Sequence, residues 1–541
     1  MTRPMIVTAM AASFLAAPPL AADPAAFVAF GPYPADDFVV TTGDASALAP
    51  APKLYFAKEW IAVPRGGVPA STYARGVGAF DDVRSWAASA EASAVPAARP
   101  PLVWLGAPER VRAARLTPDA ARMTAGGGER PLALAPRLES NRSWFDASSA
   151  RFFASRPVSL RGEARGAGFE ARTLWPDDFR LDDRAPLAPL PADRPAAAAL
   201  RDLVRADGGG ARAPFLARPL WERAPGARNW NGKPALVVMV NGAQGDDDEA
   251  WGGHFAIGTG RVGPDGAIAD VLIDNFYSLD VVSEKGILAA PVPLDNYLAD
   301  LNSGQAWYRP TAMLVAVLAT DDSPAMIQGA FNRVYAQFWR HQLPYVHSTM
   351  NCAGISVDTL RALGFDVPAQ EADAASAALA WLSIPWTLVT ERSVRTARVA
   401  YEYLTSDRTR LFPAVAFETV GAELLRLASG IPAGGDARLP ALLARDLEAI
   451  VYVHVPQFPS SRAYGSWPVA SPSEYRGKVP RDPQDAQIVP VPPRPYPSNL
   501  RDPDLLPEAR RPSYFPLAAW AAAAGIGLAG LAAWLLRRGI G

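Results

Sequence analysis

The sequence predicts an α+β protein with a β-rich N-terminal part and a C-terminal transmembrane helix. From Asn231 onward, apolar runs of strand length alternate with turns, as in "PALVVMVNG" and "TAMLVAVLAT". Helical patterns follow, the first of them at Ser323-Pro324, where Ser suits the N-cap and Pro the first helical position. Near the end of the chain, Phe515 to Leu536 carries no charge and is long enough to cross a hydrocarbon core, which needs about 20 residues.

The two ends of the chain predict where the protein lies. Residues 1–22 combine a positive start, a short apolar run and a small-residue end, which is the pattern of a secretory signal peptide. Arg537 and Arg538 directly follow the C-terminal apolar run, and positive residues stay on the cytoplasmic side of a membrane. We therefore expect a single-pass protein of the inner membrane, with the bulk of the chain periplasmic or otherwise extracytoplasmic.

The composition limits the classes of function. The chain has 53 Lys and Arg against 54 Asp and Glu, so no basic surplus favours a nucleic-acid partner. Its single Cys excludes an internal disulfide. The acidic run Asp246–Glu249 lacks the spacing of a calcium loop, and His341 and His347 with Cys352 fit no standard zinc motif. We expect no metal and no cofactor.

Composition also predicts how the chain is divided. The stretch "PVSLRGEARGAGFEARTLWP" (157–176) alternates apolar and polar residues on both sides of a Gly pair, as a β-hairpin does. After residue 455 a Pro-rich polar composition favours an extended spacer. The predicted parts are a signal peptide (1–22), a β-rich accessory domain (23–225), a thiol domain (230–370), a helical extension (371–455), a Pro-rich spacer (456–514), a transmembrane helix (515–536) and a cytoplasmic tail (537–541).

The single thiol lies in "LPYVHSTMNCAGISVDTLRALG", where a helix is expected to begin. Asn351 is a good N-cap residue, and Gly364 suits the C-terminal end. Cys352 then occupies the first helical position. Free backbone N–H groups and the helix dipole favour a thiolate there, so we expect a lowered thiol pKa. An inert, buried Cys is the alternative on position alone.

A reactive thiol needs a base, and the chain has four His. His254 begins the predicted strand "HFAIGTG", directly after Gly252 and Gly253. A His that heads a strand opposite a helix-borne Cys is the arrangement of papain-like thiol enzymes. The alternative is a surface His at the edge of a strand.

Two motifs resemble those of the NlpC-type cell-wall peptidases. "YVHSTMNCAGI" is similar to the Cys motif of that family, and "GGHFAIGTG" is similar to its His strand. His254 precedes Cys352 here, whereas Cys comes first in the common arrangement. This order resembles the circularly permuted branch of the superfamily, which includes lecithin retinol acyltransferase-like proteins. The resemblance covers about residues 230–370.

The resemblance implies a fold and a set of site residues. The fold is a permuted papain-like domain, in which an antiparallel sheet packs on a Cys-bearing helix. The implied catalytic residues are Cys352, His254 and, on the next strand, Asn275, which orients the imidazole; the adjacent Asp274 is the alternative third group. Tyr345 is the implied oxyanion or substrate contact, and the backbone N–H of Cys352 is a second donor.

Together these features favour a membrane-anchored, extracytoplasmic thiol hydrolase. It would be an amidase or peptidase that acts on cell-envelope peptides through a Cys-His acyl-enzyme. An acyltransferase that uses the same Cys on lipid or lipoprotein is one alternative. A non-catalytic cell-envelope binding or scaffold protein with a papain-like fold is another. The expected partners are the peptide or lipid substrate and the inner membrane, through the C-terminal helix.

Overall fold

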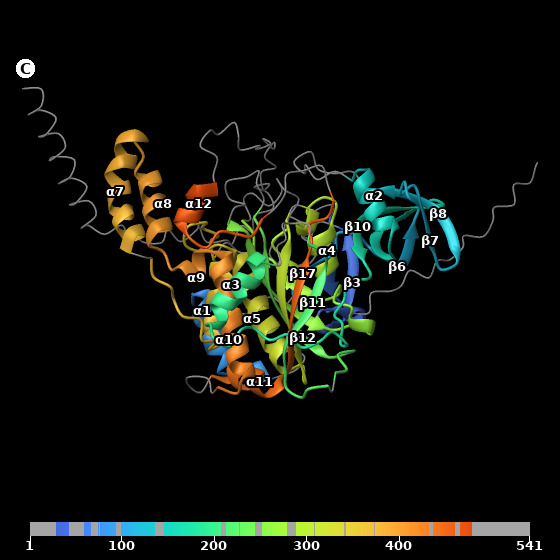
Figure 1. Cartoon of the computed structure of the whole chain (residues 1–541), viewed down its shortest axis with the longest axis horizontal. Helices are drawn as coiled ribbons and strands as arrows, with labels where there is room; N and C mark the ends of the chain where they lie inside the picture. The colour runs from blue at the N-terminus through green and yellow to red at the C-terminus, as the bar shows by residue number, and fades with distance from the viewer. Residues whose placement is uncertain are drawn as a thin grey trace, which may run out of the picture.

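The computed structural model shows an α+β protein with a central antiparallel sheet, a layer of helices and a small barrel (Figure 1). The residues that it describes are 29–42, 59–66, 74, 76–93, 99–135, 145–206, 213–226, 228–243, 252–278, 288–307, 309–339, 342–372, 374–431, 437–459 and 466–478. The predicted signal peptide, transmembrane segment and cytoplasmic tail lie outside these residues.

In the described part of the chain, seven antiparallel strands form the central sheet, in the order β11-β17-β16-β12-β13-β14-β15. Their bounds are β11 Leu216–Glu222, β12 Pro234–Asn241, β13 His254–Arg261, β14 Leu272–Asp274, β15 Pro291–Pro293, β16 Thr311–Leu318 and β17 Leu447–Val455. The inner strands β12 and β16 are buried along their whole length, as their unbroken apolar sequences require. The sheet also takes in β11 and β17, which lie outside segment 230–370.

Helices cover one face of this sheet. Gln328 of α5 (Asp322–Phe338) hydrogen bonds with Thr259, and Gly421 of α10 (Pro413–Ala428) lies against the Leu314 side chain. The Cys-bearing helix α6 (Cys352–Ala362) packs on β13. The remaining helices are α1 (Ala79–Ala87), α2 (Ala147–Ala154), α3 (Ala196–Ala206), α4 (Leu294–Ala299), α7 (Ala374–Thr390), α8 (Val394–Thr405), α9 (Arg408–Leu411), α11 (Arg438–Asp446) and α12 (Pro472–Lys478).

A closed barrel lies beside the sheet, at the right of Figure 1. It consists of β6 Glu109–Leu116, β7 Arg122–Ala125, β8 Gly128–Leu134, β9 Val158–Arg165 and β10 Gly168–Pro176. The predicted hairpin at 157–176 is confirmed, because β9 and β10 pair antiparallel across Gly166. Two small sheets complete the N-terminal region: β1 (Ala29–Phe30) with β2 (Tyr33–Pro34), and β3 (Phe38–Thr42) with β4 (Trp60–Pro64) and β5 (Val103–Trp104).

Buried ion pairs join the barrel to the sheet. Arg161 of β9 donates from Nε to the Asp295 carboxylate of α4 at 2.8 Å, and both side chains are 1% exposed. Arg110 of β6 pairs with Asp270, just before β14. Removing one member of such a pair leaves the other charge buried and uncompensated, so the contact fixes how the two parts meet.

The membrane prediction needs correction. Within the described residues, no helix combines the length and the apolar character that crossing a membrane requires. This conflicts with the predicted C-terminal transmembrane helix at 515–536, a segment that itself lies outside the described residues. We therefore correct the fold class to α+β with sheets and withdraw the single-pass inner-membrane placement.

The start of the predicted Pro-rich spacer (456–514) is folded, which differs from the prediction. Phe458, Val469 and Ala470 are buried, and Val469 and Ala470 pack with Leu411 and Phe412. Apolar side chains spaced along this stretch give it enough buried area to dock, despite its Pro content. Residues 456–459 and 466–478 thus belong to the folded body, and the rest of the predicted spacer, from residue 479, lies outside the described residues.

Asp295→Ala tests the junction between barrel and sheet. We expect this change to lower the free energy of unfolding by about 3–5 kcal/mol, because Arg161 loses its closest carboxylate while Asp270 stays 3.5 Å away. Urea denaturation followed by circular dichroism measures the difference.

Asp81→Ala is the matched control, since its pair with Arg84 is exposed at 69% and 64%. It should cost less than about 1 kcal/mol. If both variants lose the same free energy of unfolding, the buried pair of Arg161 and Asp295 does not stabilise the protein more than the exposed pair does, and the prediction is wrong.

Candidate functional site

The site begins with the N-terminus of α6, which the sequence predicts correctly. Asn351 is the N-cap: its side-chain oxygen accepts from the N–H groups of Ala353 at 3.0 Å and Gly354 at 3.1 Å. Its amide nitrogen donates to the Leu411 carbonyl at 2.9 Å, which ties the cap to α9. Cys352 is therefore held at the first helical position. Gly364 follows the helix with φ +87°, a conformation that suits a glycine stop.

The Cys352 thiol lies against the start of β13 and is only 4% exposed. The backbone N–H of Phe255, the residue after His254, donates a hydrogen bond to the sulfur. The N–H of Ala353 and the Tyr345 hydroxyl also hydrogen bond with the sulfur. The sulfur is thus next to the strand position that carries the predicted base.

His254 is buried at the first position of β13, directly across from Asn241 of β12. Among the described residues, its Nε2 atom has no hydrogen-bond partner. The Asn275 side chain lies close enough to the imidazole to favour its protonation, although the Asn275 Oδ1 atom has no hydrogen-bond partner among the described residues. The Asn275 amide nitrogen donates to the Leu288 carbonyl at 2.9 Å.

Asp274, the alternative third group, faces the other way. Ile257 is its cross-strand partner, so Asp274 lies on the face of the sheet opposite to His254. Its Oδ1 accepts from Gln328 of α5 at 2.9 Å, and burial raises the pKa of the carboxyl well above its ordinary value. Asp274 therefore belongs to the packing of α5 on the sheet.

Tyrosine rings surround the thiol and the imidazole. The Tyr345 hydroxyl accepts a hydrogen bond from the backbone N–H of Cys352 at 3.3 Å. The His254 ring lies 6.3 Å from that of Tyr297 and 6.4 Å from that of Tyr277, between ring centroids. The Tyr345 ring also lies 5.1 Å from that of His347.

Sequence reasoning missed Arg309, which carries the positive charge of the site. The side chain is 7% exposed, and its Nε donates to Gln305 at 3.0 Å. Its charge opposes protonation of His254 and favours ionisation of Cys352. Arg309 lies two residues before β16, and no local pattern there marks it as part of the site.

Burial makes the resting pair neutral. Desolvation, helped by the charge of Arg309, lowers the pKa of His254 to about 3, although Asn275 opposes the shift. Desolvation likewise raises the pKa of the Cys352 thiol, despite hydrogen bonds to the sulfur and the charge of Arg309. The expected low-pKa thiolate is therefore wrong for the resting protein, because the cost of burying a charge exceeds the helix-terminus effect.

Other predicted features do not contribute a site. The acidic run Asp246–Glu249 and His341 lie outside the described residues. Within the part of the chain that the structure describes, no group of three His, Cys, Asp or Glu side chains could hold a metal ion.

The chain matches no family model, and no curated protein and no solved structure is significantly similar to it. The geometry of the site is therefore the basis for assigning a function.

The pH dependence of alkylation tests the state of the thiol. Iodoacetamide reacts with the thiolate, and a raised pKa shifts thiolate formation to higher pH. We expect the native labelling rate of Cys352 to keep rising above pH 9, whereas free cysteine levels off, having a pKa of about 8.5. Comparing rates across pH in one protein cancels the effect of accessibility. A rate that is flat from pH 6 to 8 would instead indicate a preformed thiolate.

Arg309→Gln tests the local charge. Loss of the guanidinium removes a group that favours the thiolate, so the labelling profile should move to higher pH. Arg309→Lys retains the charge and should keep the profile close to that of the wild type. If both variants shift the profile equally, Arg309 acts through packing and not through its charge.

Proposed function

We propose that this protein is a thiol enzyme that transfers acyl groups through Cys352, most simply as an amidase or peptidase. The observation that carries the proposal is a helix-terminal thiol that bonds to the backbone of Phe255, directly after His254, whose buried imidazole has no partner for Nε2 among the described residues. The resemblance of both motifs to NlpC-type peptidases supports peptides of the cell envelope as the substrate class.

The first step follows from the neutral pair. Cys352 Sγ attacks the substrate carbonyl carbon while His254 Nε2 takes the thiol proton, so a C–S bond and an imidazolium form together. Asn275 favours the imidazolium that this transfer forms. A buried imidazolium is costly near Arg309, so the cation is favoured only while the negative oxyanion is present.

The oxyanion would be stabilised by two donors already at the thiol. The backbone nitrogen of Cys352 donates to the Tyr345 hydroxyl oxygen, 3.3 Å away; a substrate oxygen that takes the place of this acceptor would receive the N–H, and the Tyr345 hydroxyl would rotate to donate to the same oxygen. Collapse then breaks the C–N bond, and His254 returns its proton to the leaving amine. Water attacks the thioester in the second step, with His254 as base, and releases the carboxylic acid and the thiol.

One observation favours a second acceptor in place of water. The thiol is 4% exposed, and a site that excludes water protects a thioester from hydrolysis. Under this alternative the protein is an acyltransferase, and an amine or alcohol resolves the same intermediate.

Acylation by p-nitrophenyl acetate tests the acyl-enzyme that the hydrolase and the acyltransferase share. We expect a burst of p-nitrophenolate and one acetyl group on the peptide that contains Cys352, detected by mass spectrometry. Cys352→Ala should abolish the adduct. His254→Ala should slow acylation by about 10²-fold or more, because general-base catalysis is lost.

His347→Ala is the matched control, since His347 lies next to Tyr345 without sharing the position of His254. It should acylate at nearly the wild-type rate. Absence of an adduct on folded protein, with normal acetylation after unfolding, would favour the non-catalytic binding protein.

A further inference from the structure

Helix α4 (Leu294–Ala299) brings a buried tyrosine against the proposed base. The centroid of the Tyr297 ring lies 6.3 Å from that of the His254 ring, and the two planes are tilted by 43°. Aromatic side chains that pack on each other have centroids about 4.5–7 Å apart. Tyr277 lies at a similar distance, 6.4 Å, but Tyr297 is the more deeply buried of the two, at 3% exposure. Tyr297 therefore packs on the imidazole inside the site.

The Tyr297 ring is anchored to the strand pair that carries the base. Its hydroxyl donates to Asn241 Oδ1, and Asn241 lies directly across from His254 in the ladder of β12 and β13. Burial raises the pKa of the Tyr297 hydroxyl, so the group stays protonated and keeps donating. Among the described residues, Asn275 Oδ1 has no hydrogen-bond partner. Tyr297 is thus better anchored than Asn275 for holding the imidazole.

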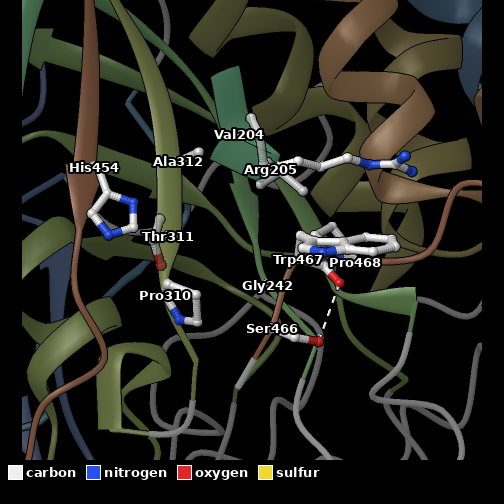
Figure 2. A pocket seen from close by; sticks show the side chains of 11 residues that line it. Val204, Arg205, Gly242, Pro310, Thr311, Ala312, His454, Ser466, Trp467 and Pro468 are labelled. Atoms are coloured by element: carbon white, nitrogen blue, oxygen red, sulfur yellow. Dashed lines mark hydrogen bonds between the residues drawn. The ribbon is translucent and has the colours of Figure 1, made fainter. Parts of the chain in front are cut away.

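The anchor continues to β16 and ends at a cavity that does not belong to the site. Asn241 donates to the Thr311 hydroxyl at 2.8 Å. Thr311, Val240 and Ala312 border a cavity of about 220 Å³, and Figure 2 shows Thr311 and Ala312 in its wall. Among the described residues that line this cavity, none is part of the thiol site. The support of the imidazole therefore comes from α4 and the sheet.

The two residues before Tyr297 on α4 bind the barrel. Asp295 accepts from Arg161 of β9 at 2.8 Å, and Asn296 Oδ1 accepts from the Thr173 hydroxyl of β10 at 3.0 Å. All four of these side chains are buried. Three consecutive residues of one short helix thus connect the barrel to the ring that packs on the base.

We infer that Tyr297 is a positioning residue for His254 and that the barrel keeps it in place through α4. Resting on the proposed acyl transfer, this gives the barrel a part in the reaction although it contributes no reacting group. The packed ring keeps the imidazole in the orientation that accepts the thiol proton. A misplacement of about 1 Å at such a group can cost about 10²-fold in rate.

Protonation of His254 in the resting protein tests the inference without a substrate. It can be followed by NMR in protein labelled with ¹⁵N-histidine. The pKa of His254 is about 3, so the wild-type ring should stay neutral down to about pH 4. Tyr297→Leu should raise this pKa, because the smaller side chain admits water to the imidazole. Tyr297→Phe keeps the ring without its anchor and should give an intermediate value.

Tyr33→Phe is the matched control, since it removes another buried tyrosine hydroxyl, which hydrogen bonds with Asn332 of α5. It should leave the pKa of His254 unchanged. An unchanged pKa in folded Tyr297→Leu and Tyr297→Phe would overturn the role of Tyr297.

The part of the barrel is tested in the same way. Thr173→Val removes the hydroxyl that bonds with Asn296, so it should also raise the pKa of His254. Ser159→Ala removes another buried barrel hydroxyl, which donates to Asp177 at 2.6 Å, and should have no effect. If Thr173→Val leaves the pKa of His254 at its wild-type value, the barrel does not hold Tyr297 in place.

Acylation by p-nitrophenyl acetate connects the inference to the reaction. Tyr297→Leu should slow acylation of Cys352 by about tenfold or more in the presence of His254 and should have no further effect in His254→Ala, because it acts through that ring. A slowing that persists in His254→Ala would overturn the inference. If the wild type is not acylated, the proposed function fails, whereas the raised pKa of His254 in Tyr297→Leu would still support the positioning by Tyr297.

Discussion

The register of β12 against β13 and β16 is the constraint on which the site depends. It sets Asn241 opposite both His254 and Thr311, so these three polar side chains share one face of the sheet. The same register sets Val240 opposite Phe255 and Ala312 on the other face. A slip of one residue would exchange the two faces and remove both the imidazole and the cavity wall from their places.

A polar network secures this register at the end of the strands. Asn241 donates to the Thr311 hydroxyl at 2.8 Å and accepts from the Tyr297 hydroxyl. All three groups are buried, so each bond would be costly to leave unmade. The network connects β12, β16 and α4, and α4 in turn carries the ion pair from Asp295 to the barrel. Packing of the barrel and position of the imidazole are therefore linked through one short helix.

Local signals in the sequence predicted the parts of the site that depend on local chemistry. The Asn351 cap, the Gly364 stop and the strand that begins at His254 follow from neighbouring residues alone. Helix α5 begins at Asp322, two residues before the predicted first helical position at Pro324, a small error of the same local kind. The effect of the Arg309 charge on the site and the raised pKa of Cys352 both depend on tertiary burial, which no local pattern encodes. The docking of residues 466–478 depends likewise on distant apolar partners.

The place of β17 in the sheet has a consequence for how the chain folds. This strand pairs with β16 on one side and β11 on the other, although it comes near the end of the described sequence. Its contacts are long-range in sequence, and such contacts slow folding. Until Leu447–Val455 is made, β11 and β16 both present unpaired edges, which are templates for aggregation. The unfinished chain is therefore the form of this protein that most needs protection by a chaperone.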